Sequence, residues 1–185
     1  MTPLIVTEGT QDAELLYWVL DAERPLGLKI QPAGGKSSAE SLARSALMRR
    51  RSPVALVVDA DTFDSRRVDE QKRFIKSLLP HELAEMHCLV QVVPALQVLL
   101  FRQPTALSLA LGTPPSEDDL REGLYRPREM LRELGRRHFG DDRWGILMPR
   151  LRSQSAVELR NEPEMQQLIA FIREAPAIRG EATLP

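Results

Sequence analysis

Two short apolar runs in this chain each lead into a pair of acidic residues. The run at 3–6 is followed by Glu8 and Asp12, and the run at 54–58 by Asp59 and Asp61. Apolar runs of four or five residues that stop at a carboxylate or glycine are typical of buried parallel strands, whose carboxyl ends gather ligands. Carboxylates that converge there repel one another unless a cation lies between them, and oxygen ligands suit Mg²⁺. The pattern therefore predicts a metal site.

The size of the chain favours one domain. It has 185 residues, of which 43% are hydrophobic, and a formal net charge of -1. This length is enough for one well-buried core and short for two, while the balanced charge neither requires nor excludes a nucleic-acid partner. The single cysteine, Cys88, lies in an apolar stretch and fits a reducing compartment. No run approaches the length of a membrane span, so we expect a cytoplasmic protein with no membrane contact.

Segments with strand and helix patterns alternate over the first half of the chain. Strand patterns lie at 3–6, 28–30, 54–58 and 88–93. Helical spacing of apolar residues occurs between them, at 12–20, 39–48 and 68–79. Short strands that alternate with helices of ten or so residues predict an α/β fold. We expect a compact domain with a four-stranded, mainly parallel sheet flanked by helices.

The last third of the chain has a helical pattern without strands. The stretch 117–139 predicts one or two helices broken near Pro127, and 156–173 predicts another that is kinked at Pro163. We expect the tail beyond Pro176 to be loose. The predicted organisation is an α/β core at 1–110 that binds the metal and a helical extension of the same domain at 111–185.

Two glycine-containing motifs follow the first two strands. In the first, Glu8 lies at the strand end, Gly9 in the turn and Asp12 at the start of the helix, so both acids can face one cavity. A cap and a dipole contact at a helix start explain the same residues. The second motif ends in Gly34-Gly35-Lys36 but lacks the leading glycine of a nucleotide-binding loop. It is either a phosphate-holding turn or an ordinary connection.

The segment after the third strand is the sharpest signal. Side chains alternate in an extended segment, so Asp59 and Asp61 are expected on one side, where they offer oxygen ligands to one or two ions. Asp64 is a possible additional ligand. Aspartate is also common in turns, and receiver-like or phosphatase-like folds end strands in aspartate.

The order of these motifs resembles the TOPRIM domain of topoisomerases, bacterial primases, small RNA maturases and overcoming-lysogenization-defect (OLD) nucleases. The resemblance covers about residues 3–94 and is strongest to the nuclease branch. It implies that Glu8, Asp12, Asp59 and Asp61 bind one or two Mg²⁺ or Mn²⁺ ions. One departure is Gln97, which stands where related nucleases often have an acidic residue, so binding of a second ion is in doubt.

The activity implied by this resemblance is hydrolysis of nucleic-acid phosphodiester bonds. Glu8 would act as a ligand or as a general acid or base, and Lys36 would supply positive charge in the transition state. The expected partner is DNA or RNA, held by arginines outside the centre: Arg66, Arg67, Arg128, Arg132 and Arg136. The last three are four residues apart and form one stripe on a helix, although solvated surface charge also explains them.

Two other functions remain open. One is a catalytically weak TOPRIM-like binding or regulatory subunit that works with an ATPase, as in bacterial defence systems that pair a TOPRIM nuclease with an ATPase. The four acids at 8, 12, 59 and 61 favour the enzyme, since a scaffold gains nothing from carboxylates that repel one another. The other is a receiver-like phosphoacceptor domain, which would carry its acidic pair after the first strand rather than after the third.

Overall fold

The core of the protein is a four-stranded, all-parallel sheet. A computed structural model describes residues 3–23 and 27–175. The strands are β1 (Leu4–Thr7), β2 (Lys29–Pro32), β3 (Val54–Asp59) and β4 (His87–Val92), in the order β2-β1-β3-β4. In the register, Val6 of β1 lies beside Leu56 of β3, and Leu56 lies beside Leu89 of β4. The strand β3 is therefore central and buried along its whole length.

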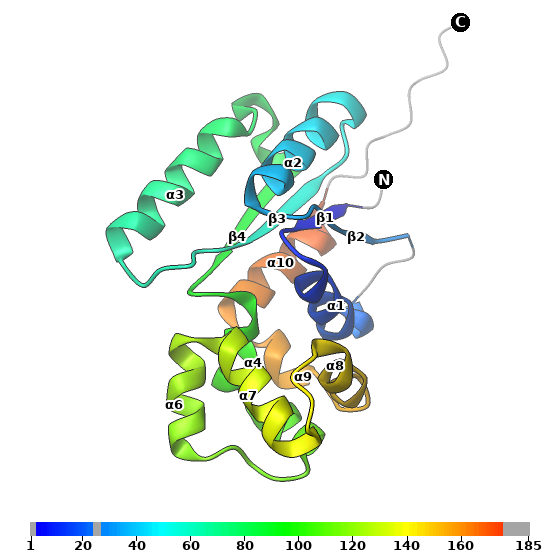
Figure 1. The fold of residues 1–185 in the computed structure, drawn as a ribbon. Coiled ribbons are helices and arrows are strands. Elements are labelled where there is room, and N and C mark those ends of the chain that lie inside the picture. The colour runs from blue at the N-terminus through cyan, green and yellow to red at the C-terminus, as the bar shows by residue number, and fades with distance from the viewer. Residues whose placement is uncertain (1–2, 24–26, 176–185) are drawn as a thin grey trace, which may run out of the picture.

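Two helical layers enclose this sheet (Figure 1). Helices α2 (Lys36–Arg50) and α3 (Ser65–Leu78) cover one face, where Val6, Leu56 and Val58 share an apolar cluster with Leu47 and Ile75. The other face is covered by α1 (Thr10–Val19) and by helices from the second half of the chain. Because parallel sheets are stable when both faces are covered, their strands are apolar runs rather than alternating patterns.

The second half of the chain forms a helical layer, whose helices lie below the sheet in Figure 1, apart from the last one, which lies at the level of the sheet. Its elements are η3 (Leu96–Val98), α4 (Leu99–Arg102), α5 (Thr105–Leu111), α6 (Glu117–Tyr125), α7 (Pro127–Phe139), α8 (Trp144–Arg152), α9 (Val157–Arg160) and α10 (Pro163–Glu174). Short helices η1 (Asp21–Glu23) and η2 (His81–Met86) precede β2 and β4. Helix α10 returns to pack against β4, where Gln167 Nε2 donates to the Leu89 carbonyl at 3.1 Å.

The structure confirms the α/β fold class and the four-stranded parallel sheet. It also confirms the break at Pro127, which is the first residue of α7, a position where proline fits a helix. At Pro163 the chain starts a separate helix rather than kinking one, because α9 ends at Arg160. The tail beyond Pro176 lies outside the described residues. No helix in the described ranges is long and apolar enough to cross a membrane.

A charge inside β3 is expected to abolish folding. Val57 is 2% exposed and packs in the core cluster beneath the sheet. Val57→Asp would bury an unpaired carboxylate at a cost of several kcal/mol, against a total stability of roughly 5–15 kcal/mol. We expect no cooperative thermal unfolding transition by circular dichroism. Val57→Ala, which removes only methyl groups, should unfold cooperatively at a lowered temperature, and a native-like transition for Val57→Asp would contradict this account.

Candidate functional site

Glu8 and Lys36 are brought together by the ends of β1 and β2. The amides of Gly34 and Gly35 both donate to the Glu8 carbonyl at 2.9 Å, so the loop after β2 is fixed against the end of β1. Both glycines have positive φ angles, 83° and 139°, which favour residues without a Cβ. Lys36 is the first residue of α2, and its Nζ lies 3.9 Å from Glu8 Oε1.

Asp12 is a buried carboxylate on the first turn of α1. Its Oδ2 accepts a hydrogen bond from the Gly9 amide at 3.0 Å, which completes the start of the helix. Its Oδ1 accepts from Gln97 Nε2 at 2.8 Å. Gln97 is 1% exposed and lies in η3, just after β4. The side chain of Asp12 is therefore both a helix cap and part of a buried polar contact.

Asp59 and Asp61 lie in different environments at the end of β3. Asp59 is 2% exposed, and its Oδ1 accepts from the Leu96 amide at 2.8 Å, while its own amide donates to Glu8 Oε1 at 2.9 Å. The strand ends at Asp59, and Asp61 has a left-handed φ of 53°. The side chain of Asp61 is half exposed. The alternation of an extended strand therefore does not continue to Asp61.

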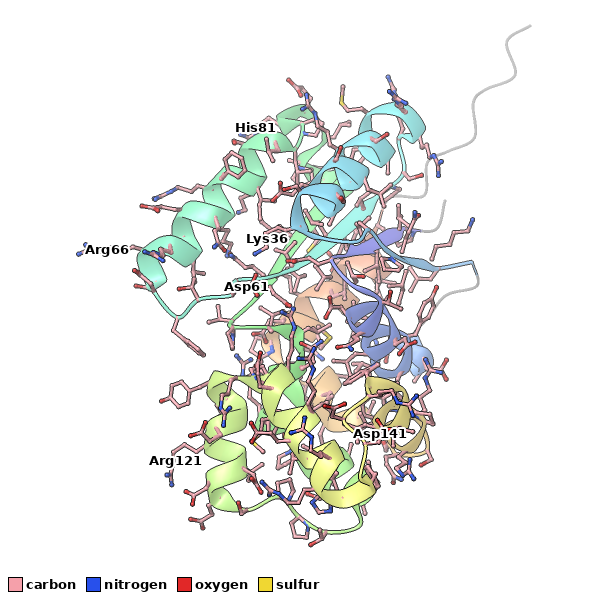
Figure 2. The ribbon with its side chains drawn as sticks, viewed as in Figure 1. Lys36, Asp61, Arg66, His81, Arg121 and Asp141 are labelled. Atoms are coloured by element: carbon pink, nitrogen blue, oxygen red, sulfur yellow. The ribbon has the colours of Figure 1, made fainter. Side chains whose placement is uncertain are left out.

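Two cationic side chains connect these acids, and one of them, Lys36, lies next to Asp61 in Figure 2. Lys36 Nζ lies 3.0 Å from Asp61 Oδ2. The guanidinium of Arg128, from the first turn of α7, contacts Asp59 Oδ2 through Nη2 and lies 3.5 Å from Asp61 Oδ1 through Nη1. Arg128 thus joins the helical layer to the carboxyl end of the sheet. The group formed by Glu8, Asp12, Asp59, Asp61, Lys36 and Arg128 is called the acidic centre below.

The carboxylates of the acidic centre are costly to ionise together. Burial raises the pKa of Asp59 to about 7, and the Asp12 charge adds to the increase, although Arg128 and the Leu96 amide oppose it. Burial also raises the pKa of Glu8, against the opposing effects of the Asp59 amide and Lys36. Burial disfavours the charged form of Arg128, but the surrounding carboxylates outweigh it and raise the pKa of Arg128. Perturbed values of this kind are typical of functional sites.

The donor chemistry of the acidic centre fits a hard divalent cation. Carboxylate oxygens are the ligands that Mg²⁺ takes in proteins, and the Arg128 guanidinium stands in as a cation against Asp59 and Asp61. Among residues 3–23 and 27–175, however, no three acidic, histidine or cysteine side chains have the arrangement of a metal site. Because Arg128 already contacts Asp59, an ion that binds this carboxylate would have to compete with the guanidinium.

The other residues predicted from the sequence lie outside this group or at its edge. Asp64 caps α3, where its Oδ1 accepts from the amides of Arg66 and Arg67 at 3.0 and 3.5 Å. Figure 2 shows Arg66 pointing outward, away from Lys36 and Asp61. The arginine stripe of α7 divides: Arg128 belongs to the acidic centre, and Arg136 pairs with Asp142 at 2.6 Å. Arg132 lines a pocket that also contains Arg128.

Sequence reasoning missed two features of the centre. It treated Arg128 as a surface contact for nucleic acid, because nothing in the sequence connects it with Asp59, which is 69 residues away. It noted Gln97 only as a neutral substitution, whereas the structure makes this amide the partner of Asp12. One weak feature of the sequence indicates that Gln97 is buried: every other residue of 95–101 is apolar.

Comparison with known proteins supports the fold. The chain has a TM-score of 0.61 with the structure of the C-terminal region of the Burkholderia pseudomallei OLD protein, at 16% sequence identity. The match covers 94% of this chain and 98% of that chain. No known protein-family profile matches the sequence, and no curated protein matches it either. At this identity the likeness shows that the two chains share a fold, and it leaves the activity open.

The stability of the metal-free protein is expected to fall between pH 4 and pH 7. The pKa of Asp59 is about 7 when folded, against roughly 3.9 in an unfolded chain. Between these two values the folded state keeps a proton on Asp59 that the unfolded state has lost. Protonation of Asp59 therefore contributes up to about 4 kcal/mol to the free energy of unfolding, fully below about pH 4, and this contribution is lost as the pH rises to 7.

The measurement is urea unfolding in chelator at pH 4, 5.5 and 7. Asp59→Asn should remove this part of the change in unfolding free energy with pH, since the amide does not titrate. Asp118→Asn on α6 should keep it. The same pH dependence of the unfolding free energy in wild type and Asp59→Asn would show that Asp59 ionises normally.

Proposed function

We propose that this protein hydrolyses nucleic-acid phosphodiester bonds with the help of Mg²⁺ or Mn²⁺. The observation that carries the proposal is the acidic centre, in which four carboxylates from α1 and from the segments that end and follow β1 and β3 meet two cationic side chains. This edge of a parallel sheet is where ligands bind in open α/β folds. The shared fold with part of an OLD protein supports the same conclusion.

The proposed roles follow from burial and contacts. A divalent ion held by Asp59, Asp61 and Asp12 would require these side chains to rearrange and Arg128 to leave Asp59. Once bound, it would neutralise phosphate charge and lower the pKa of a water. Glu8 has a raised pKa, so it is suited to take a proton from the attacking water or to act as a further ligand. In the balanced reaction the water oxygen forms a bond to phosphorus, the bond to the leaving oxygen breaks, and that oxygen takes up a proton.

Lys36 and Arg128 are proposed to hold the scissile phosphate. Both lie against acids of the centre and are partly exposed, with 28% and 35% of their side chains accessible. Arginine presents several N–H donors in a plane, which suits phosphate oxygens, while lysine acts as a compact charge. In this proposal residues 1–110 supply the acids and Lys36, and residues 111–185 supply Arg128. Cytoplasmic action is part of the same proposal.

A catalytically weak subunit acting beside an ATPase is the second candidate. Arg128 and Lys36 neutralise part of the acidic charge within the chain, so the acids do not require an ion for the protein to fold. The contact between Arg128 and Asp59 also holds the helical layer against the sheet, which gives these residues a structural use. Metal binding and cleavage distinguish the two candidates.

Divalent metal should raise the melting temperature of the protein. A ligand that binds only the folded state stabilises it by mass action, by about 2.7 kcal/mol at one hundred times its dissociation constant. Mg²⁺ or Mn²⁺ at millimolar concentration should therefore shift thermal unfolding upward in the wild type. The double variant Asp59→Asn, Asp61→Asn should lose the shift, and Asp118→Asn on the surface of α6 should retain it. Equal shifts in all three proteins would rule out this metal site.

Glu8→Gln should fold normally and lose cleavage. The glutamine carbonyl can still accept from the Asp59 amide, so the circular dichroism spectrum should be unchanged. Cleavage of labelled DNA and RNA in Mg²⁺ or Mn²⁺ should fall at least about a hundredfold, the usual scale for removing a general acid or base. Glu85→Gln is the matched control, because Glu85 lies in η2, which precedes β4 and so lies at the opposite end of the sheet. Cleavage by Glu8→Gln at the wild-type rate would assign Glu8 a structural role.

A further inference from the structure

Two pockets lie on either side of Arg128 and open beside the acidic centre. The first, called the Trp144 pocket, has a volume of about 320 Å³ and is lined by Gln11, Gln97, Arg128, Arg132, Trp144 and Leu147, among others. The second, called the Phe63 pocket, has a volume of about 310 Å³ and is lined by Asp61, Phe63, Pro94, Tyr125 and Arg128, among others. Both volumes lie at the lower end of the range for ligand sites. Arg128 forms part of both walls, so the pockets flank the acidic centre.

The Trp144 pocket combines an aromatic ring with unused polar groups. Trp144 is half-buried, and its Nε1 donates to Glu14 Oε2 at 2.8 Å, which fixes the indole in place. Across the described part of the chain, Arg132 has no ion-pair partner, and Gln97 Oε1 is buried without a hydrogen bond. A buried acceptor without a partner is costly. A ligand with an N–H or O–H donor would satisfy it, and an anion would pair with Arg132.

The Phe63 pocket carries two exposed aromatic rings. Phe63 is 52% exposed and Tyr125 is 64% exposed. Their ring centroids are 5.5 Å apart with an interplanar angle of 56°. The two rings therefore pack against each other, although neither is buried in the core. Phe63 follows Asp61 by two residues and Tyr125 precedes Arg128 by three. Exposed rings next to cationic groups are a stacking surface for nucleobases, since every base has an aromatic face.

We propose that the substrate is an unpaired nucleic-acid strand that crosses Arg128. One base stacks against Phe63 and Tyr125, the scissile phosphate lies over the acidic centre, and a base on the other side enters the Trp144 pocket. There the indole stacks on the base, Gln97 Oε1 accepts a hydrogen bond from the nucleotide, and Arg132 pairs with the next phosphate. This inference rests on the proposed function, because it defines both pockets relative to the reacting phosphate.

An intact duplex does not fit this arrangement. Its bases are stacked and paired inside the helix, so a base would have to be flipped out to reach either pocket, at a cost of a few kcal/mol. A single strand offers its bases without that cost. The two pockets therefore predict a preference for single strands that the acidic centre alone would not produce, since phosphates are common to both substrates.

The test is equilibrium binding of a labelled 12-nucleotide strand and of the blunt duplex of the same sequence. Fluorescence anisotropy is measured with DNA and with RNA, in Ca²⁺ in place of Mg²⁺ to slow cleavage. We expect the strand to bind at least about tenfold more tightly than the duplex. Trp144→Leu and Phe63→Leu should each weaken strand binding about fivefold or more, the lower end of the effect of losing one stacked base, and should leave duplex binding unchanged.

Matched controls separate stacking from folding. Phe74→Leu changes another exposed phenylalanine, 59% accessible on α3, and should bind the strand as the wild type does. Trp144→Phe keeps an aromatic ring and should retain most of the affinity if stacking is the cause. In Trp18→Phe, Trp144 is the only tryptophan left, so quenching of its fluorescence by a mononucleotide reports on the pocket directly.

The outcomes distinguish this inference from the proposed function. Equal binding of strand and duplex, or strand binding by Trp144→Leu or Phe63→Leu equal to that of Phe74→Leu, would overturn the inference. Metal-dependent cleavage in that case would leave the proposed function standing. Strand binding that depends on Trp144 and Phe63, without cleavage under any metal condition, would support the two pockets as base-binding sites and overturn the proposed hydrolysis.

Discussion

The buried carboxylate of Asp59 is the constraint on which the rest of this structure depends. It lies at the end of the central strand, 2% exposed and close to Glu8, which follows β1, and to Asp12 of α1. A lone charge in such a position costs several kcal/mol. The Leu96 amide and the Arg128 guanidinium offset this cost, and these two groups come from the segment after β4 and from α7. One side chain thus fixes the sheet, the η3 turn and the helical layer relative to one another.

The helical layer is therefore part of the site as well as part of the core. Its apolar residues share one cluster with α1 and the lower face of the sheet, and α10 packs on the edge strand β4. Its polar contribution is concentrated in η3, α7 and the start of α8, where Gln97, Arg128 and Trp144 lie. A sheet of this topology supports many activities, and the side chains added at its carboxyl edge determine which one it has.

The sequence predicts most of the sheet and the helices within 117–139 and 156–173, but it does not predict the helices at 96–111 and 144–152. Apolar runs that end in acids identify β1 and β3, because parallel strands are buried on both faces. The region 95–111 contains η3, α4 and α5, and its nearly continuous apolar run has no period that separates helix from strand. Because the acids follow strands of a parallel sheet, the sequence predicts that they lie at the same edge of that sheet. It does not predict their contacts, since Asp61 leaves the extended conformation and Arg128 approaches from a helix that no local pattern orients.

In the proposed function, the contact between Arg128 and Asp59 would make ion binding an exchange reaction. A cation that binds Asp59 replaces an existing partner, so its apparent affinity is lower than bare carboxylates would give. The released guanidinium is then free to accept an anion. An anion that stabilises the released arginine would increase the affinity of the protein for the cation. Thermodynamic linkage requires that the cation increases the affinity for the anion by the same factor. In the proposed nuclease, phosphate and cation would therefore bind with positive cooperativity, and the ion-free protein would bind a cation weakly in the absence of phosphate.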